Sequence, residues 1–307
     1  HVQYGGKNLV WVGVNMAARI DVLPTAGPEN VYGGLFRGME LIVTDAVTIG
    51  LDGFGSDGLM FRAAKITENK AECSLNVKVN SQIQRQVRLE VSVHDAEGNT
   101  VASAEHTPRV NEGFTDVSIP FEIQDPVLWQ GVENPYLYTV AVKLVDGRNE
   151  DKLSFRTGIR SFAADPFAGF FLNGRSYPLK GVVLYRDRAT YGPIALEPQL
   201  REDLDLICEM GANAIRVAGG THHPDFYRLC DERGLIVVND SPFVGSSSLG
   251  RKGFYDSPDF KDNGKRQLKE MIYQLYNHPS VAVWGIFSEP ELRGDDPLPF
   301  IRELNAT

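Results

Sequence analysis

Cysteine is scarce in this chain, and the few cysteines present form no pattern. Cys73, Cys208 and Cys230 are spread over 307 residues, and none belongs to a C-x-x-C pair. Structural zinc sites and disulfide frameworks both depend on clustered or paired cysteines. The spacing argues against either arrangement, and we expect all three residues to be small, buried side chains.

The sequence also lacks basic runs and long apolar runs. Its formal net charge is −9, from 31 Lys and Arg against 40 Asp and Glu, and such an acidic chain is a poor match for nucleic acid or an anionic membrane. No apolar stretch reaches the roughly 20 residues that a membrane-spanning helix needs. His1 to Gly5 shows no signal-peptide pattern, and a chain that starts within a longer protein would show none in any case. We expect no nucleic-acid partner and no membrane partner.

The length of the chain allows two domains and part of a third, and the residue pattern changes twice along it. Residues 1–52 contain strand-like runs at Leu9–Val12 and Met39–Val43, on either side of a loop rich in Pro and Gly at Pro24–Gly34. A few strands cannot bury a core by themselves. We therefore interpret residues 1–52 as the end of a β-domain.

Residues 53–157 alternate apolar and polar residues with the two-residue period of half-buried strands. The alternation is clear at 87–93, 117–123 and 138–144, and turn signals such as Glu97-Gly98-Asn99 separate the runs. Short alternating strands at this spacing predict an antiparallel sandwich of immunoglobulin type.

From residue 158 to residue 307, strand-like apolar runs alternate with helical stripes. Strands are expected at 178–184, 212–217, 235–238 and 281–287. Helices are expected from Pro198 to Gly211, over Pro224–Arg233, around Leu268–Tyr276 and around Pro299–Leu304. Four consecutive strand–helix units predict a parallel sheet with helical crossovers.

Four such units do not close an eight-stranded barrel. The first and last strands would present open apolar edges, which folded proteins avoid, so we expect the first half of a (β/α)8 barrel that continues past Thr307. The alternative is a doubly wound sheet of four strands. No glycine-rich phosphate loop follows the first strand to support that alternative.

The last expected strand ends in a lone carboxylate. Val281–Phe287 is apolar without alternation, as expected for a strand covered on both faces, and Glu289 follows it directly before Pro290. In a barrel, that rim carries the catalytic groups. From these residues alone, a catalytic Glu289 and a solvated glutamate at the end of an ordinary core strand are equally supported.

Several motifs, in this order, resemble family 2 of the glycoside hydrolases, the family of β-galactosidases, β-glucuronidases and β-mannosidases. Asn30–Arg37 resembles the end of the family's sugar-binding jelly roll, Leu128–Tyr138 the late strands of its immunoglobulin-like domain, and Phe155–Arg160 the hinge into its barrel. Segments similar to the first three barrel units are Phe171–Gly174 with Leu179–Val182, Gly211–Arg216, and Phe226–Leu235.

The resemblance implies a multidomain β plus α/β fold in three parts. Residues 1–52 would be the C-terminal part of the jelly-roll domain, residues 53–157 an immunoglobulin-like β-sandwich, and residues 158–307 the first half of the TIM-barrel catalytic domain.

The resemblance also implies a retaining mechanism with two carboxylates about 5 Å apart. Glu289 matches the acid/base, which protonates the leaving oxygen and later deprotonates the attacking water. Its pKa would have to be raised, and apolar neighbours such as Trp284 and Phe287 would do this. The nucleophile lies further along the family's barrel, and no segment before Thr307 matches it.

Five further positions correspond to residues that surround the family's substrate. Arg216 would orient the nucleophile region as a planar fork, with a structural salt bridge as the alternative, and Asp187 would contact sugar hydroxyls or lie solvated in its loop. Three positions depart from the family pattern: Ser288 replaces an Asn that contacts the 2-hydroxyl, Tyr185 replaces a His, and Asp240 stands where a longer acidic or aromatic residue is common.

A second family His is replaced by Gly219. His222 and His223 follow it closely and are candidates to replace the missing imidazole, but a surface histidine pair is the slightly favoured interpretation. With Ser288 and Tyr185, this departure leaves open either an unusual substrate or a weakened site.

The leading interpretation is a retaining exo-β-glycosidase that hydrolyses terminal β-linked sugars, with β-galactosides as the favoured substrates. β-Glucuronides and β-mannosides are the alternatives within the family, and a non-catalytic carbohydrate-binding relative is the alternative of another class. The expected partner is a carbohydrate substrate, and a homo-oligomer is open. We expect no cofactor. Some relatives bind Mg²⁺ near the acid/base, but the sequence shows no cluster of residues that would bind a metal ion. The family includes periplasmic and extracellular bacterial enzymes, yet no residue reports localisation.

Overall fold

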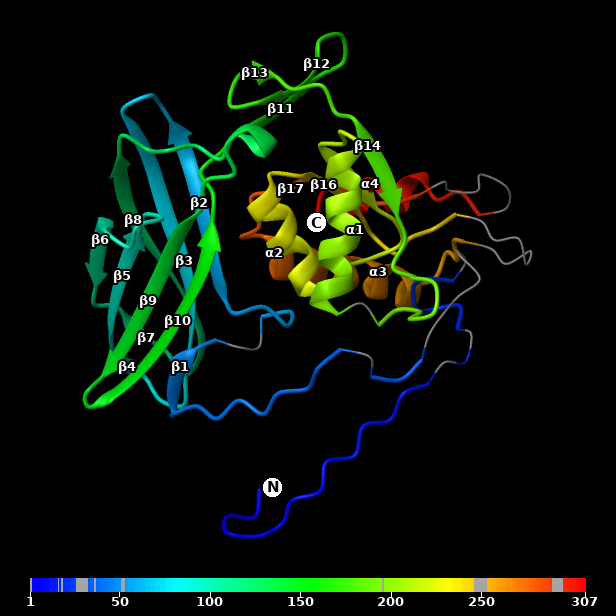
Figure 1. Cartoon of the computed structure of the whole chain (residues 1–307). Helices are drawn as coiled ribbons and strands as arrows, with labels where there is room; N and C mark the ends of the chain where they lie inside the picture. The colour runs from blue at the N-terminus through cyan, green and yellow to red at the C-terminus, as the bar shows by residue number, and fades with distance from the viewer. Residues whose placement is uncertain are drawn as a thin grey trace.

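The computed structural model describes residues 2–15, 17, 19–25, 33–35, 37–50, 53–194, 196–245, 253–288 and 295–307. Two bodies make up most of the described part, a β-sandwich and a parallel sheet covered by helices, and a small hairpin-like sheet lies above them (Figure 1). The chain thus combines β and α/β architecture, as the sequence analysis predicted.

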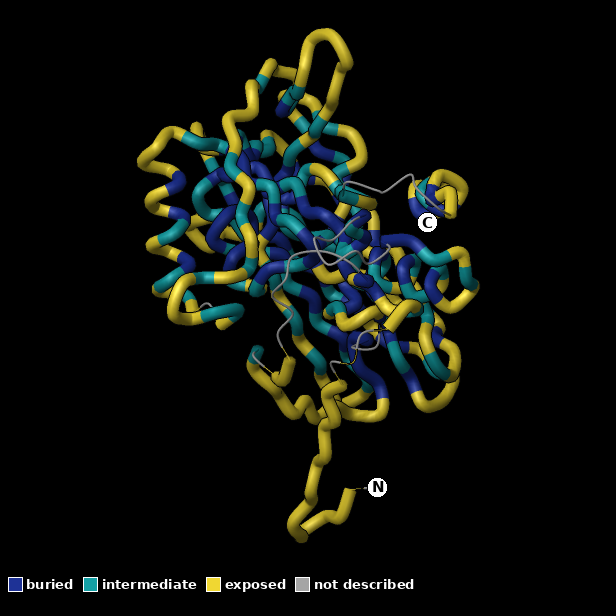
Figure 2. Tube along the Cα trace, turned by 90° about the vertical axis from the view of Figure 1, so that its right-hand side faces the viewer, coloured by how far each residue is buried: buried dark blue, intermediate teal, exposed yellow. Residues whose placement is uncertain are grey.

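The strands expected near the N-terminus do not form. Leu9–Val12 and Met39–Val43 contain no strand, and Trp11 is 87% exposed. A strand needs partners for its backbone N–H and C=O groups, and no described residue pairs with either run. Figure 2 shows this segment as an exposed tail. Several residues of the Asn30–Arg37 motif lie outside the described residues, so the jelly-roll assignment stays a prediction.

The predicted sandwich is confirmed. One sheet has the order β1-β3-β2, with β8 also paired to β3, and the other has the order β10-β9-β5-β6. Their bounds are β1 Val47–Ile49, β2 Leu59–Ile66, β3 Lys70–Ser81, β5 Arg88–His94, β6 Thr100–His106, β8 Gly113–Gln124, β9 Tyr138–Asp146 and β10 Asn149–Thr157. The short strands β4 (Arg85–Gln86) and β7 (Arg109–Val110) pair beside them. Alternate residues of both sheets face inward and form one buried core.

A three-stranded sheet connects the sandwich to the parallel sheet. It consists of β11 (Phe162–Asp165), β12 (Gly169–Leu172) and β13 (Arg175–Ser176). Phe171–Gly174 therefore belongs to β12 and its turn, and the expectation that it forms part of the first barrel strand is wrong. The left-handed backbone at Asn173 and Gly174 makes a tight hairpin, which returns the chain before the barrel strand begins.

The four predicted strand–helix units are confirmed. The parallel strands lie in sequential order, β14 (Gly181–Leu184), β15 (Ala214–Val217), β16 (Ile236–Asp240) and β17 (Val281–Gly285). The helices are α1 (Glu197–Glu209), α2 (Pro224–Arg233), α3 (Pro258–Leu275) and α4 (Leu298–Asn305). A doubly wound sheet reverses its strand order at a switch point, and this order has no reversal, which favours the half-barrel.

One face of the parallel sheet is covered and the other is partly open. Ile215 and Val237 pack against the helices, whereas the row Val183–Arg216–Val238–Val283 lies on the opposite face. Val183 is 50% exposed and Val283 is 40% exposed. The expectation that the last strand is covered on both faces is therefore wrong for the described residues, because the inner face of such a sheet is buried only when the sheet closes.

The cysteine prediction holds for two of the three residues. Cys73 and Cys230 are buried, but Cys208 is exposed on α1. The buried residues of α1 are Leu200, Leu204 and Ile207, and Cys208 lies at the edge of this stripe.

Candidate active site

The carboxyl ends of the four parallel strands meet along one edge of the sheet. Leu184 pairs with Val217, Val217 with Asn239, and Asn239 with Trp284. The residues that follow each strand therefore share one rim, as predicted. This edge positions Tyr185, Asp240 and the segment that leads to Ser288.

Three of the predicted site residues form one hydrogen-bonded cluster at this rim. The Arg216 Nε donates to Asp240 Oδ2 at 2.8 Å, and its Nη2 lies 2.7 Å from the same oxygen. The Nη2 also donates to Ser288 Oγ at 3.1 Å. Asp240 is 2% exposed, and a carboxylate this deeply buried needs such a cation to offset its lost hydration. The structural salt bridge that the sequence left open for Arg216 is present, with Asp240 as its partner.

A glycine makes room for the buried carboxylate. Gly285 pairs with Asp240 across β16 and β17, and a Cβ on Gly285 would lie 2.1 Å from Asp240 Oδ1. The sequence analysis missed this residue because it treated Gly285 as part of an apolar run. A glycine inside a strand often marks a close approach, so the signal was present.

The segment after β17 is fixed to the segment after β16. Ser288 N–H donates to the Phe243 carbonyl at 2.8 Å, and Gly245 N–H donates to the Ser288 carbonyl at 2.9 Å. Ser241 Oγ donates to the Ile286 carbonyl at 2.8 Å. These bonds continue the parallel pairing beyond the strands and hold the Ser288 backbone in place. Glu289 is the next residue in the sequence, and it lies outside the described residues, as do Pro290 and Glu291.

Tyr185 and Asp187 lie on the same rim but are exposed. Tyr185 directly follows β14, is 56% exposed and makes no hydrogen bond within the described part of the chain. Asp187 is also exposed, in the loop that leads to α1. Their proposed contacts with sugar hydroxyls stay predictions.

The loop after β15 differs from what the sequence suggested. Gly219 has a φ of +72°, and its carbonyl accepts from Arg186 Nη2 at 2.9 Å. His222 is 6% exposed and stacks on Phe226 with 4.6 Å between ring centroids. The interpretation of a surface histidine pair is therefore wrong for His222, because its ring is buried against Phe226 of α2.

The two histidines have structural partners. The Nδ1 of His222 accepts the His223 N–H at 2.8 Å, and the His223 side chain accepts the Asp225 N–H at the start of α2. Burial, with Arg37 and Arg186 nearby, lowers the pKa of His222 to about 4. His222 is therefore neutral at physiological pH, and its Nδ1 is already occupied.

Within the described ranges, no group of three His, Cys, Asp or Glu side chains could hold a metal ion. In the same ranges, no helix is both long and apolar enough to cross a membrane. The described part of the rim carries the Arg216 guanidinium, the buried Asp240 carboxylate and the Ser288 hydroxyl. Ser288 directly precedes Glu289 in the sequence. This arrangement is suited to orienting the polar groups of a substrate.

Comparison with known proteins gives matches over both bodies. Residues 60–160 match the model of "Glycosyl hydrolases family 2", and residues 167–303 match that of "Glycosyl hydrolases family 2, TIM barrel domain". A β-glucuronidase of Bacteroides fragilis is 38% identical over 99% of this chain and 44% of its own length. A β-galactosidase of Thermoanaerobacter pseudethanolicus is 26% identical over 99% of this chain and 39% of its own length.

A solved structure agrees with these matches. The β-glucuronidase of Bacteroides uniformis superposes with a TM-score of 0.80 and 26% identity, over 95% of this chain and 35% of that one. The chain thus spans less than half the length of these relatives.

Proposed function

Because this chain belongs to family 2 of the glycosyl hydrolases, we propose that the protein containing it is a retaining exo-β-glycosidase. The observation that carries the proposal is the Arg216–Asp240–Ser288 cluster at the carboxyl ends of the parallel strands. This is the rim where barrels of this type mount their catalytic groups. Residues 1–52, 53–157 and 158–307 are proposed as parts of three domains.

In this proposal Glu289 is the acid/base. It donates a proton to the glycosidic oxygen as the leaving group departs, and then takes a proton from the water that releases the sugar. The second carboxylate, the nucleophile, lies outside these 307 residues. Arg216 donates to the hydroxyl of Ser288, the residue that precedes Glu289 in the sequence, and Ser288 keeps one hydroxyl hydrogen to donate.

Two classes of substrate, β-galactosides and β-glucuronides, have to be assayed. The sequence analysis favoured β-galactosides, but the relative with 38% identity is named a β-glucuronidase, and the β-galactosidase above has 26% identity. We therefore propose β-glucuronides as a second candidate substrate of equal standing. A non-catalytic carbohydrate-binding protein is the alternative of another class, motivated by Ser288, Gly219 and Tyr185.

Glu289→Gln in the full-length protein tests the proposal. General acid catalysis contributes roughly 10²- to 10⁴-fold, and poor leaving groups depend on it most. We expect kcat/KM to fall by that amount on an alkyl glycoside and far less on a dinitrophenyl glycoside. Glu291→Gln, two residues further along, is the matched control and should change neither rate. Unchanged hydrolysis by Glu289→Gln would reject the site. Sugar binding without hydrolysis by the parent would favour the non-catalytic alternative.

A further inference from the structure

Each of the five residues that lead into β17 makes a polar contact with a residue from another part of the fold. These residues, Asn277–Val281, connect α3 to the strand that ends at the candidate site. Their partners come from the sandwich, from the hinge that follows it and from α2. We call this set of contacts the β17 clamp.

The side-chain amide of Asn277, the first residue of the clamp, bonds to the backbone of the sandwich. The Asn277 Oδ1 accepts the Phe61 N–H at 2.9 Å, and its Nδ2 donates to the Leu59 carbonyl at 2.8 Å. Asn277 thus bonds to β2 in the way that a neighbouring strand residue would. Only a side chain that has both a donor and an acceptor at this length can make this pair of bonds.

The buried carboxylate of Asp231, in α2, contacts His278 and Ser280. Asp231 is 4% exposed, its Oδ2 lies 2.6 Å from His278 Nδ1, and its Oδ1 accepts the Ser280 N–H at 3.0 Å. Its own carbonyl accepts the Trp129 Nε1–H at 2.9 Å. The carboxylate therefore links two residues of the clamp to α2, which is itself tied to the end of the sandwich.

The hinge supplies the last contacts. Arg160 donates from Nε to the Pro279 carbonyl at 3.1 Å and from Nη2 to the Val281 carbonyl at 3.3 Å. Its guanidinium lies 4.4 Å from the centroid of the Phe162 ring, and burial lowers its pKa to about 10. A partly buried cation that bonds two carbonyls of one short segment fixes that segment along its own length.

Packing alone does not hold this junction. A cavity of about 250 Å³ lies between the two bodies, lined by residues that include Phe61, Arg160, Asn277, Pro279 and Trp284. Where side chains do not fill the space, the directional bonds of the clamp set the distance between sandwich and strand. The pairing of β17 with β16 also shifts register between Val237 and Val238, which locally interrupts the ladder of backbone hydrogen bonds.

We propose that Asn277 and Asp231 are positioning residues, which set where the chain after β17 places Ser288, the residue before the proposed acid/base in the sequence. The β-sandwich would then contribute to catalysis by fixing the acid/base strand. This inference rests on the proposed function for its kinetic test. A displacement of about 1 Å in catalytic geometry can cost on the order of 10²-fold in rate.

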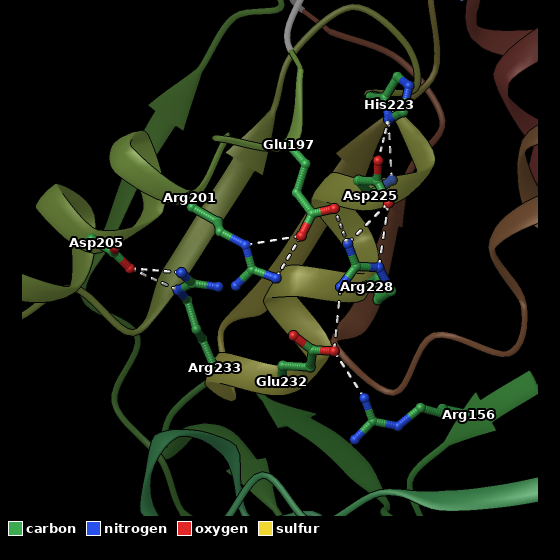
Figure 3. Close-up of polar contacts among 9 residues, drawn as sticks. All are labelled: Arg156, Glu197, Arg201, Asp205, His223, Asp225, Arg228, Glu232 and Arg233. Atoms are coloured by element: carbon green, nitrogen blue, oxygen red, sulfur yellow. Dashed lines mark hydrogen bonds and ion pairs between the residues drawn. The ribbon is translucent and has the colours of Figure 1, made fainter. Parts of the chain in front are cut away.

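The same interface provides a matched control. Arg156 of β10 donates to Glu232 of α2 at 2.8 Å, and Figure 3 shows this pair at one end of the ion-pair network around α2. It joins the same two bodies but does not contact residues 277–281. Arg156→Gln therefore loosens the interface without releasing the clamp.

The experiment compares Asn277→Ala, Asp231→Asn and Arg156→Gln in the full-length protein with two substrates of the same sugar. For both clamp variants we expect kcat/KM on an alkyl glycoside to fall about tenfold or more, and on a dinitrophenyl glycoside less than about threefold. Arg156→Gln should leave the ratio of the two rates unchanged. An equal loss on both substrates, or the same pattern in Arg156→Gln, would show that the clamp serves stability only.

Hydrogen exchange separates this inference from the proposed function. The Ser288 amide donates to Phe243, so its exchange reports whether the end of β17 has moved. We expect faster exchange over residues 281–288 in Asn277→Ala and no change there in Arg156→Gln. If the parent hydrolyses neither sugar, the proposed function fails and this exchange pattern still decides the positioning role. Unchanged protection of Ser288 in both clamp variants would overturn it.

Discussion

Replacement of Gly285 by alanine should disrupt the cluster at the candidate site. The added Cβ would lie 2.1 Å from Asp240 Oδ1, so the carboxylate must move from its place beside Arg216. Overpacking of this kind costs about 1–3 kcal/mol, and a weakened buried ion pair adds to it. We expect a loss of about 2–4 kcal/mol in the free energy of unfolding, or roughly 4–16 °C in the Tm of the α/β body.

Thermal and urea unfolding measure this loss, and two comparisons identify its cause. Gly38→Ala is the matched control, because a Cβ there meets no atom within 4 Å and its φ is not positive; it should stay within about 0.5 kcal/mol of the parent. In an Asp240→Ser background the cost of Gly285→Ala should largely disappear. If Gly285→Ala is as stable as the parent, the packing argument is refuted.

Two further predictions concern stability. The pKa of His222, about 4, lies below its ordinary value of 6.5, so the unfolded chain binds the proton more readily. The contribution of His222 is therefore complete above pH 6.5 and is lost as the pH falls from 6.5 toward 4, by up to about 3 kcal/mol. In His222→Phe, Tm should change less between pH 7 and pH 5 than in the parent. Trp129 is fully buried and donates to the Asp231 carbonyl, so Trp129→Phe should cost about 1–3 kcal/mol in urea unfolding. The exposed control Trp11→Phe should cost nothing measurable, and equal effects of the two would contradict the assignment.

Local signals in the sequence predicted the regular elements well. Pro224 lies in the first turn of α2, and Gly234 forms its left-handed C-cap. The two-residue alternation gave the sandwich strands, since each has one face in the core. These elements could be predicted because their causes lie within a few residues.

The N-terminal runs show where local pattern fails. Leu9–Val12 has the composition of a strand, but strand formation depends on a partner that lies elsewhere in the chain or beyond it. Cys208 fits the helical stripe of α1 but lies at its edge, and the width of a buried stripe depends on what packs against it.

The sequence predicted individual residues of the candidate site but not the contacts among them. Arg216, Asp240 and Ser288 were each identified from the resemblance to the family, yet their mutual hydrogen bonds depend on the register of three strands. Gly285 was missed because an apolar run surrounds it, and the β17 clamp was missed because its partners are distant in sequence. Asn277 and Phe61, for example, are separated by 216 residues.

The central claim, that Glu289 is the acid/base of a retaining β-glycosidase, is tested most directly by azide rescue of Glu289→Ala. Azide needs no deprotonation, so it can attack the glycosyl-enzyme intermediate without a general base. On a dinitrophenyl β-glucuronide or β-galactoside, the account predicts that azide accelerates turnover of the full-length variant and yields a β-glycosyl azide. Full activity of Glu289→Ala without azide, or an azide product of α configuration, would contradict it.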